Sequence, residues 1–299
     1  DPAAFVARPY RRLTRRFVEA GALAWFRDLG SVEPEGGARW VGALELCALV
    51  TGQVPEVARR LGARRFVITW GNDPRNPLYR LPPYRQALAR SRSSDLVICT
   101  IEAALDHCLA LGIAEDRCRV VLPPVDTERF HPPAHPVEEP VALFVSPLAE
   151  NKGIDRVLDA FELVRKRVPE ARLAVAGRGP LEPMVRERAA ASGGAVTYVG
   201  SLPGDEVAAL LRTGAVFVTA PRPTRVWNEQ FGLAYVEAMA SGLPVVTTEC
   251  GTNHEAVLAP SIRVPDEVGA LADGLVHFLG DPALRRRIFP EVRRVVVDR

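Results

Sequence analysis

Residues 228–238 read NEQFGLAYVEA and continue over 239–246 as MASGLPVV. The apolar residues of this stretch recur at a helical spacing, which predicts a buried helix over 231–240. Gly242 and Pro244 then end that helix and begin an apolar strand. The stretch therefore predicts a buried helix followed directly by a buried strand.

The rest of the second half alternates strands and helices in the same manner. Repeated β-α units with near-continuous apolar strands predict a parallel sheet covered on both faces. Ligands of such sheets bind beyond the carboxyl ends of the strands, so the loops that leave those ends are expected to converge on one site. The predicted strands are 141–145, 172–176, 196–199, 215–219, 244–248 and 262–264; the predicted helices are 154–168, 181–191, 206–212, 231–240 and 268–279; and the loops are 146–153, 177–180, 200–204 and 222–232.

The first half is less regular. Residues 131–140, HPPAHPVEEP, contain four prolines, which exclude a helix or an inner strand and indicate a linker. We therefore expect an N-terminal Rossmann-like domain over 1–133, a linker over 134–140 and a C-terminal Rossmann-like domain over 141–299. The strands predicted in the first half are 40–46, 66–69, 96–100 and 119–122, and the helices are 54–61, 83–89 and 101–111.

Composition limits the class of protein. Of the 299 residues, 47% are hydrophobic and 25% are charged, as in an ordinary soluble globular protein. The net charge of +2 argues against a strong nucleic-acid binder. No run of 18 apolar residues is present to span a membrane, and no charged-then-apolar leader indicates secretion.

The cysteines predict a reducing compartment. They number five, form no C-x-x-C pair and are odd in number. Reduced, buried thiols in a cytoplasmic protein are therefore expected, and a disulfide or zinc framework is not. The five residues are Cys47, Cys99, Cys108, Cys118 and Cys250.

Two carboxylates frame the start of the predicted helix. Glu229 lies in the loop before it, and Glu237 lies about two turns into it. The free N–H groups of residues 230–233 favour an anion, most naturally a phosphate. An ionised carboxylate accepts hydrogen bonds from two neighbouring hydroxyl groups. A phosphate between two polyols, which describes a sugar nucleotide, fits this pattern.

This stretch resembles the E-x7-E signature of retaining glycosyltransferases of family 4, whose GT-B fold has two Rossmann-like doubly wound domains facing a cleft. In that family the first glutamate contacts the donor sugar and the second contacts the nucleotide ribose; the matching positions are Glu229 and Glu237. The backbone at Phe231 and Gly232 matches residues that face the sugar and the diphosphate. The alternative is an exposed Glu229 and a buried, hydrogen-bonded Glu237 without a ligand. The Phe-Gly pair and the EAMASGLPVV that follows disfavour it.

The resemblance covers about residues 40–290 and is strongest over 141–257. Residues 1–38 lack the strand and glycine-rich loop with which family members usually open. The chain also ends before the family's usual last helix. The resemblance therefore implies a truncated chain or an N-terminal domain that is incomplete or remodelled.

Lys152, at the start of a predicted helix, is similar to the family's donor-diphosphate lysine. A cation beside a helix N-terminus binds phosphate well, although an exposed lysine near a helix cap is the alternative. The family adds an arginine five positions earlier, where this chain has Pro147. Arg178, Arg222 and Arg225 are candidates to supply that missing charge.

Two weaker motifs complete the set. The G-x-G at 177–179 either leaves backbone space near a donor or forms a plain β-α turn, and Glu182 stands where a dinucleotide fingerprint needs a third glycine. The WGND at 70–73 resembles a first-domain motif near the acceptor. Its Asp73 would orient an acceptor hydroxyl or form an Asx-turn before Pro74.

In the loop after the 244–248 strand, Thr252 or Asn253 is expected to cap the next helix.

Together with these residues, the resemblance implies transfer of a hexosyl or N-acetylhexosaminyl group from a nucleotide-diphosphate sugar to an acceptor hydroxyl, with retention of configuration. Catalysis would be electrostatic, through Glu229, Lys152 and Asp73. Neither a metal nor a cofactor is expected, since no Asp-x-Asp stands in the relevant loops. The expected donor-binding residues are Glu237, Gln230, Phe231, Gly232, Leu233, Gly177, Gly179 and Arg178.

Other functions stay open: a non-catalytic sugar-nucleotide-binding partner of a transferase, or an epimerase or phosphorylase on the same fold. A dehydrogenase is disfavoured, because no acidic residue ends the strand after Gly179 to hold a nicotinamide ribose. The expected partners are the donor and a hydroxyl acceptor on a glycan, a lipid or a small molecule. The Arg-rich stretch 8–16 favours an amphipathic helix, with peripheral membrane contact as the alternative. The sequence leaves the donor base, the sugar, the acceptor and the oligomeric state open.

Overall fold

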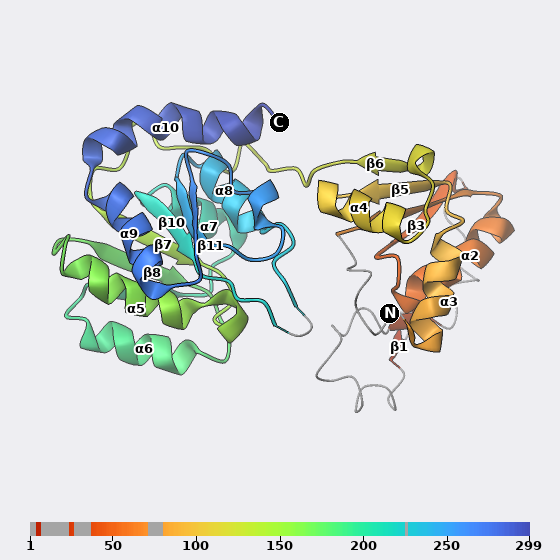
Figure 1. The fold of residues 1–299 in the computed structure, drawn as a ribbon, viewed down its shortest axis with the longest axis horizontal. Coiled ribbons are helices and arrows are strands. Elements are labelled where there is room, and N and C mark those ends of the chain that lie inside the picture. Colours follow the sequence, from red (N-terminus) through yellow and green to blue (C-terminus); the bar gives the residue numbers. More distant parts are fainter. Residues whose placement is uncertain (1–3, 7–23, 27–36, 71–79, 225–226) are drawn as a thin grey trace. The chain divides into compact units, whose positions relative to one another are not determined.

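The computed structural model describes residues 4–6, 24–26, 37–70, 80–224 and 227–299. The chain divides into two units, Asp1–Pro123 and Pro124–Arg299, each described here by itself. Each unit is built on a parallel sheet flanked by helices, as the sequence predicts (Figure 1).

The first unit holds a four-stranded parallel sheet in the sequential order β3-β4-β5-β6. All of its predicted strands and helices are present, with ends shifted by at most two residues. A short antiparallel pair, β1 (Ala4–Val6) with β2 (Ala24–Phe26), is not predicted by the sequence pattern. The other elements are β3 (Trp40–Leu44), η3 (Leu49–Gln53), α2 (Val54–Leu61), β4 (Arg64–Thr69), α3 (Pro82–Ser91), β5 (Leu96–Cys99), α4 (Glu102–Ala110), η5 (Glu115–Arg117) and β6 (Cys118–Val120).

The second unit holds a six-stranded parallel sheet in the order β12-β11-β10-β7-β8-β9. The chain builds outward from β7 through β8 to β9, then crosses to β10 and builds the other way, so the sheet is doubly wound as predicted. The elements are β7 (Val141–Val145), η6 (Glu150–Lys152), α5 (Ile154–Arg165), β8 (Arg172–Ala176), α6 (Glu182–Ala191), β9 (Val196–Gly200), α7 (Gly204–Leu211), β10 (Val216–Thr219), α8 (Leu233–Ala240), β11 (Val245–Thr248), η7 (Asn253–Glu255), β12 (Ile262–Val264), α9 (Val268–Leu279) and α10 (Pro282–Val297).

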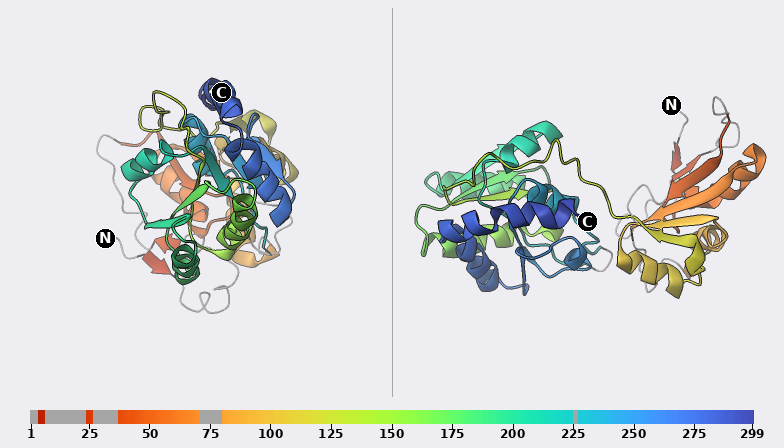
Figure 2. Two further views of the ribbon diagram at one scale, coloured as in Figure 1. Left: turned by 90° about the vertical axis from the view of Figure 1, so that its left-hand side faces the viewer. Right: turned by 90° about the horizontal axis from the view of Figure 1, so that it is seen from above.

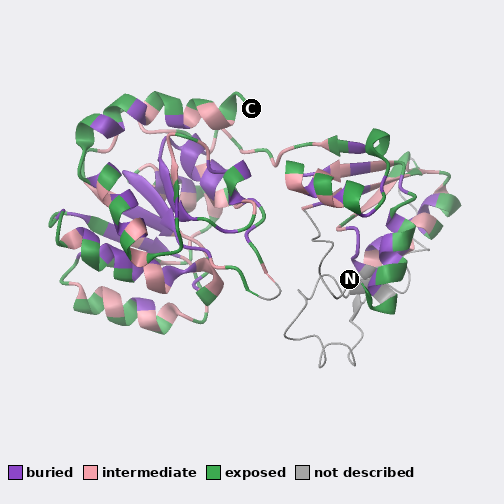
Figure 3. Cartoon of the chain, in the orientation of Figure 1, coloured by how far each residue is buried: buried purple, intermediate pink, exposed green. Residues whose placement is uncertain are grey.

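The central strands of this sheet form its core. Every residue of β10 and β11 is buried, as are the three middle residues of β7 (Figure 3). Nearly continuous apolar runs rich in β-branched and aromatic residues, such as VFVT and VALFV, suit strands covered on both faces. On the helix layers, α5 packs against α6 and α9, and α8 packs against α10 (Figures 1 and 2). Right-handed crossovers in opposite directions place α5 and α8 on opposite faces.

The last helix, α10, follows the last element that the sequence analysis assigns and is not among the predicted helices. It contains Pro290, although proline disfavours a helix interior. Its start carries the expected signals, however. Pro282 occupies the first turn, and the Asp281 side chain accepts a hydrogen bond from the Leu284 N–H at 2.8 Å. The buried Arg285 then donates to the Phe278 and Leu279 carbonyls at 2.7 and 3.0 Å, which fastens α10 to the end of α9.

Residues 134–140, predicted as the linker, belong to the second unit. There the Glu138 carbonyl accepts a hydrogen bond from Arg285 at 2.6 Å, and its carboxylate pairs with Arg286 at 2.8 Å. The linker assignment itself stays a prediction. Among the helices of the described residues, none combines the length and the apolar composition that crossing a membrane requires.

Candidate functional site

The candidate site lies where the second sheet changes its direction of winding. Strands β7 and β10 are neighbours, with Ala142 beside Val216 and Leu143 beside Phe217. From their carboxyl ends the chain departs toward α5 and α8, on opposite faces of the sheet. The crevice that opens between two such loops is the usual ligand site of doubly wound sheets. Lys152 comes from the β7 loop and Glu229 from the β10 loop.

Lys152 and Glu229 form an ion pair, with the Lys152 Nζ 2.7 Å from the Glu229 Oε2. The Glu229 side chain is 10% exposed and that of Lys152 is 21% exposed, so the pair is sheltered from solvent for the most part. The ring of Trp227 lies 4.4 Å from the same ammonium. An ammonium has three donors, so Lys152 keeps hydrogen-bonding capacity beyond this carboxylate. The sequence analysis places both charges at the site but misses Trp227, whose only signal is an aromatic residue next to the motif.

The backbone of Glu229 is held by the loop that follows β11. The Thr252 N–H donates to the Glu229 carbonyl at 2.9 Å, and the Thr252 hydroxyl donates to the carbonyl of Gln230. Gly251 makes this approach possible: its φ is +58°, and a Cβ there would lie 2.0 Å from the Glu229 carbonyl oxygen. The predicted capping role is wrong, because no side chain caps η7 and the Thr252 hydroxyl is used to hold the Glu229 loop instead.

Helix α8 starts at Leu233, two residues later than predicted, because Gly232 takes a left-handed φ of +83°. A Cβ at Gly232 would lie 2.3 Å from the ring of Tyr235, so this close packing also requires glycine. The Tyr235 hydroxyl shares hydrogen bonds with the Thr219 and Thr247 hydroxyls, and burial raises the pKa of this phenol. Phe231 is buried below the loop.

Around that start, Gln230 and Leu233 are exposed, whereas Phe231 is only 2% exposed. The first turn of a helix directs backbone N–H groups outward, which suits an anion at this end of α8. The start of α8 next to Glu229 therefore combines peptide donors with the Lys152 ammonium.

Glu237 lies one turn into α8 and is half-buried. Burial raises its pKa, and the Arg129 guanidinium partly opposes that shift. The ligand-free alternative expects an exposed Glu229 and a buried Glu237. The structure shows the opposite order, because Glu229 as a whole residue is only 8% exposed whereas Glu237 is half-buried.

The loop that carries Lys152 is fixed by Gly153. This residue has a φ of +68°, and a Cβ on it would lie 1.8 Å from the Ala220 carbonyl oxygen at the end of β10. The Arg222 N–H also donates to the Asn151 carbonyl at 3.0 Å. These contacts bring the β7 and β10 loops together, which sets the separation of Lys152 and Glu229.

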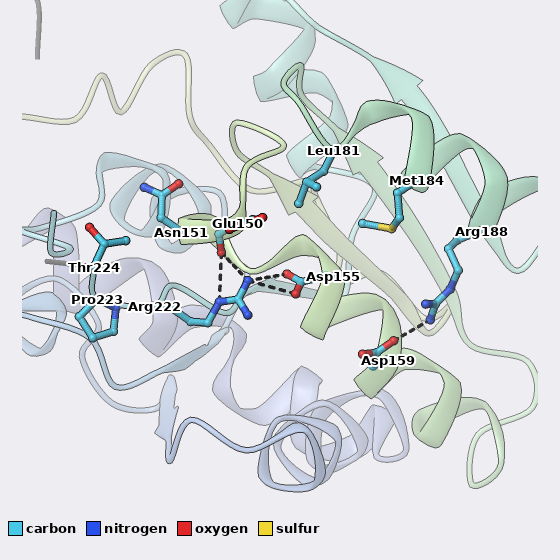
Figure 4. A pocket seen from close by; sticks show the side chains of 10 residues that line it. All are labelled: Glu150, Asn151, Asp155, Asp159, Leu181, Met184, Arg188, Arg222, Pro223 and Thr224. Carbon is cyan, nitrogen blue, oxygen red and sulfur yellow. Dashed lines mark hydrogen bonds and ion pairs between the residues drawn. The ribbon is translucent and has the colours of Figure 1, made fainter. Parts of the chain in front are cut away.

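Arg222, a candidate for the charge that the resemblance implies at position 147, is engaged by groups of its own surroundings. Its guanidinium is paired with the Asp155 carboxylate at 3.0 Å and donates to the Glu150 carbonyl at 2.7 and 3.1 Å (Figure 4). Arg225, the other candidate on this loop, lies outside the described residues.

A groove of about 570 Å³ lies between α5 and α6, and one of its ends is lined by Arg222, Asp155 and Glu150. Its other end is crossed by an ion pair of Arg188 with Asp159 at 2.9 Å (Figure 4). Neither Lys152 nor Glu229 lines this groove, so we place the candidate site at the switch point and not here.

The two glycines of the G-x-G pack one loop against another. A Cβ at Gly177 would lie 2.0 Å from the Ser146 carbonyl oxygen, and one at Gly179 would lie 2.4 Å from that of Leu148. The Leu148 N–H donates to the Arg178 carbonyl at 2.9 Å. The exposed side chain of Arg178 lies on this loop, beside the segment that leads to Lys152. A plain β-α turn is therefore sufficient to explain why both positions are glycine.

The WGND motif of the first unit, at 70–73, is only partly described. Asp73 lies outside the described residues. Thr69 and Trp70 precede it in the chain. The Thr69 hydroxyl and the Trp70 N–H donate hydrogen bonds to the Glu45 carboxylate at 3.2 and 3.3 Å. Glu45 follows β3 with a φ of +67°, a strained value for a residue with a Cβ. The carboxyl ends of β3 and β4 are thus tied together where the WGND motif begins.

The described residues contain one group of side chains that could hold a metal ion, and it belongs to the first unit. It consists of Cys99, Cys108 and Cys118. All five cysteines are free and buried, as expected.

Comparison with known proteins identifies the family. A family model described as glycosyl transferases group 1 matches residues 139–281. The chain is 30% identical over 263 residues to the GDP-mannose-dependent alpha-(1-6)-phosphatidylinositol monomannoside mannosyltransferase of Mycolicibacterium smegmatis, covering 81% of this chain and 67% of that protein. It is 31% identical over 187 residues to the mannosylfructose-phosphate synthase of Agrobacterium fabrum, covering 56% of this chain and 40% of that protein.

Solved structures agree on the fold. HepE of Anabaena, solved in complex with UDP, matches with a TM-score of 0.70 at 17% identity, covering 87% of this chain and 74% of that one. The chain spans 39% to 67% of the length of five curated relatives that it matches. The family model matches residues within the second unit, and the relative from Mycolicibacterium smegmatis aligns with 81% of this chain. This chain therefore belongs to the group 1 glycosyl transferases, of the family 4 type with the GT-B fold.

Proposed function

We propose that this protein transfers a sugar from a nucleotide-diphosphate donor to an acceptor hydroxyl, with retention of configuration at the anomeric carbon. The observation that carries the proposal is the Lys152–Glu229 ion pair at the switch point of the second sheet. A sugar diphosphate presents an anion next to a set of hydroxyl groups. An ammonium beside a carboxylate, with the start of α8 alongside, is complementary to both parts.

Each group has a part in this mechanism. As the bond between the sugar and the diphosphate breaks, negative charge builds on the leaving phosphate, where Lys152 and the N–H groups at the start of α8 stabilise it. The Glu229 carboxylate accepts hydrogen bonds from the sugar hydroxyls and stabilises the oxocarbenium-like sugar. A phosphate oxygen of the donor takes the proton of the acceptor hydroxyl on the same face, which retains the configuration. Glu237 binds the ribose hydroxyls.

GDP-mannose is the first donor to test. The relative from Mycolicibacterium smegmatis is named as GDP-mannose-dependent and aligns with 81% of this chain. Because Pro147 stands where the resemblance implies an arginine, we expect Lys152 to be the main side-chain cation on the diphosphate. We propose that catalysis needs neither a metal nor a cofactor, with the nucleotide sugar as substrate.

Calorimetric titration with GDP, UDP, ADP, CDP and dTDP in the absence of metal tests the donor site. We expect GDP to bind at least tenfold more tightly than the others, about 1.4 kcal/mol of selectivity. A folded sample that binds none of the five would contradict the donor site.

Nuclear magnetic resonance of mannose released from GDP-mannose then tests the reaction. Release of the α anomer first supports retention, whereas release of the β anomer would refute it. Binding of GDP-mannose without any turnover, also with candidate acceptors present, would support the non-catalytic partner function instead.

A further inference from the structure

Three cysteine sulfurs meet inside the first unit. Cys99 is the last residue of β5, Cys108 lies near the end of α4, and Cys118 is the first residue of β6. Their exposed fractions are 0%, 0% and 5%. The three Sγ atoms all lie within 4.8 Å of one another, and those of Cys99 and Cys108 are 3.7 Å apart.

The fold brings these sulfurs together although their spacing in the sequence forms no motif. Strands β5 and β6 are neighbours, with Val97 beside Cys118. Helix α4 connects them and returns across the sheet, which sets Cys108 over the strand that ends in Cys99. The strand pairing and the α4 connection therefore account for the meeting of the three sulfurs, which the expectation from sequence spacing alone does not anticipate.

The cluster has the donor atoms and nearly the dimensions of a zinc site. Zinc–thiolate bonds are about 2.3 Å long, so two sulfurs on one tetrahedral zinc are separated by roughly 3.8 Å. The Cys99–Cys108 separation already meets this value, and the third sulfur needs a shift of at most about 1 Å. Thiolates are soft ligands that select Zn²⁺ or Cu⁺ over Mg²⁺ or Ca²⁺.

The net charge of the occupied site favours Zn²⁺ over Cu⁺. Three thiolates leave a net charge of −1 with Zn²⁺ and −2 with Cu⁺, and a buried site penalises the larger charge more. We propose that Cys99, Cys108 and Cys118 bind one Zn²⁺ ion, whose fourth ligand is an oxygen from the backbone or from water. The ion would tie β5, α4 and β6 together, and β6 is only three residues long. The site uses none of the residues to which the proposed transfer reaction gives a role.

Cobalt titration of the full chain tests the site. The protein is stripped with a chelator, kept under anaerobic phosphine reductant, and titrated with Co²⁺ while thiolate-to-cobalt absorption in the near ultraviolet is recorded. We expect the band to saturate at one ion per chain and to disappear when Zn²⁺ is added. The Cys108→Ser and Cys118→Ser variants should each bind Co²⁺ at least tenfold more weakly.

Cys47→Ser is the matched control, since Cys47 is a buried cysteine of the same unit outside the cluster. It should bind Co²⁺ like the parent, and circular dichroism should show which variants remain folded. The parent chain itself decides the outcome even where a variant fails to fold. Absence of the thiolate band in reduced parent protein would overturn the proposal, as would equal loss of the band in Cys47→Ser.

Discussion

At the scale of single residues, the ion pair between Lys152 and Glu229 leads to separable effects on binding and turnover. Lys152→Met removes the ammonium, so we expect GDP to bind at least tenfold more weakly, about 1.4 kcal/mol. Glu229→Gln keeps Lys152 and its access to the diphosphate. GDP affinity should therefore stay within about threefold of the parent, while turnover of GDP-mannose falls about a hundredfold or more.

The chain offers a matched control for this pair, because Lys166 is its only other lysine. Lys166 is exposed at the end of α5, and Lys166→Met should leave both quantities unchanged. Calorimetry gives the affinity and release of labelled mannose gives the turnover. Equal loss of GDP binding in both lysine variants would refute the role given to Lys152.

Glu237 should lower the stability of the free protein at neutral pH. Its folded pKa is raised, first by burial, so its contribution to stability is fully present below its unfolded pKa of about 4.3 and is lost as the pH rises through the folded pKa. Glu237→Gln removes a carboxylate that is poorly solvated when folded. The variant should therefore have the higher Tm at pH 7, and the difference should vanish near pH 4. It should also bind GDP more weakly, and a variant less stable than the parent at pH 7 would contradict the assignment.

The sequence could predict which residues approach this site but not how they pair. Glu229 and Lys152 stand out by the motif and by the helix start. The distance between them depends on contacts that no spacing encodes, such as Gly153 against Ala220 and Gly251 against the Glu229 carbonyl. The role of Arg222 could not be predicted either, because the Asp155 that neutralises it belongs to another element.

At the scale of elements, the junction between η6 and α5 depends on one glycine. Gly153→Ala would force a Cβ to within 1.8 Å of the Ala220 carbonyl oxygen, at a φ of +68°. We expect a loss of about 3 kcal/mol or more in the free energy of unfolding, since both strain and a backbone clash are introduced. GDP binding should weaken as well, because Lys152 is the preceding residue.

Gly193→Ala separates strain from the clash. Gly193 has a similar φ of +64° but open space around its Cβ position. Its alanine variant should lose only about 1 kcal/mol of stability, and its GDP affinity should be unchanged. Urea denaturation measures both variants. Equal losses would mean that the approach of Ala220 does not matter.

Most elements of both units could be predicted because their periodicities are strong. In the second unit, the fully apolar β10 and β11 and the exact bounds of α9 follow from hydrophobic patterning. Helix α10 is the exception. Its interior Pro290 argues against a helix locally, and the contacts that stabilise it, including Arg285 with the end of α9, are tertiary.

At the scale of the whole molecule, two units with separate cores should respond separately to heat. GDP binds the second unit in our proposal, so it should raise the transition of that unit alone. At a concentration of about 100 times Kd the added stability is about 2.7 kcal/mol. Differential scanning calorimetry with and without GDP measures this. A single transition that moves as a whole would show that the two units unfold together.

The last helix has a consequence for how the second unit is bounded. The Arg293 guanidinium of α10 donates to the Phe130 carbonyl at 2.9 Å and to the Thr127 carbonyl at 3.1 Å, in the segment by which the chain enters this unit. Helix α10 and the segment 127–130 are thus hydrogen-bonded to each other. A fragment cloned from 141 to 281, where the sheet starts and the family model stops, would lack both partners of these hydrogen bonds. An expression fragment of this unit should instead begin at Pro124 and keep α10.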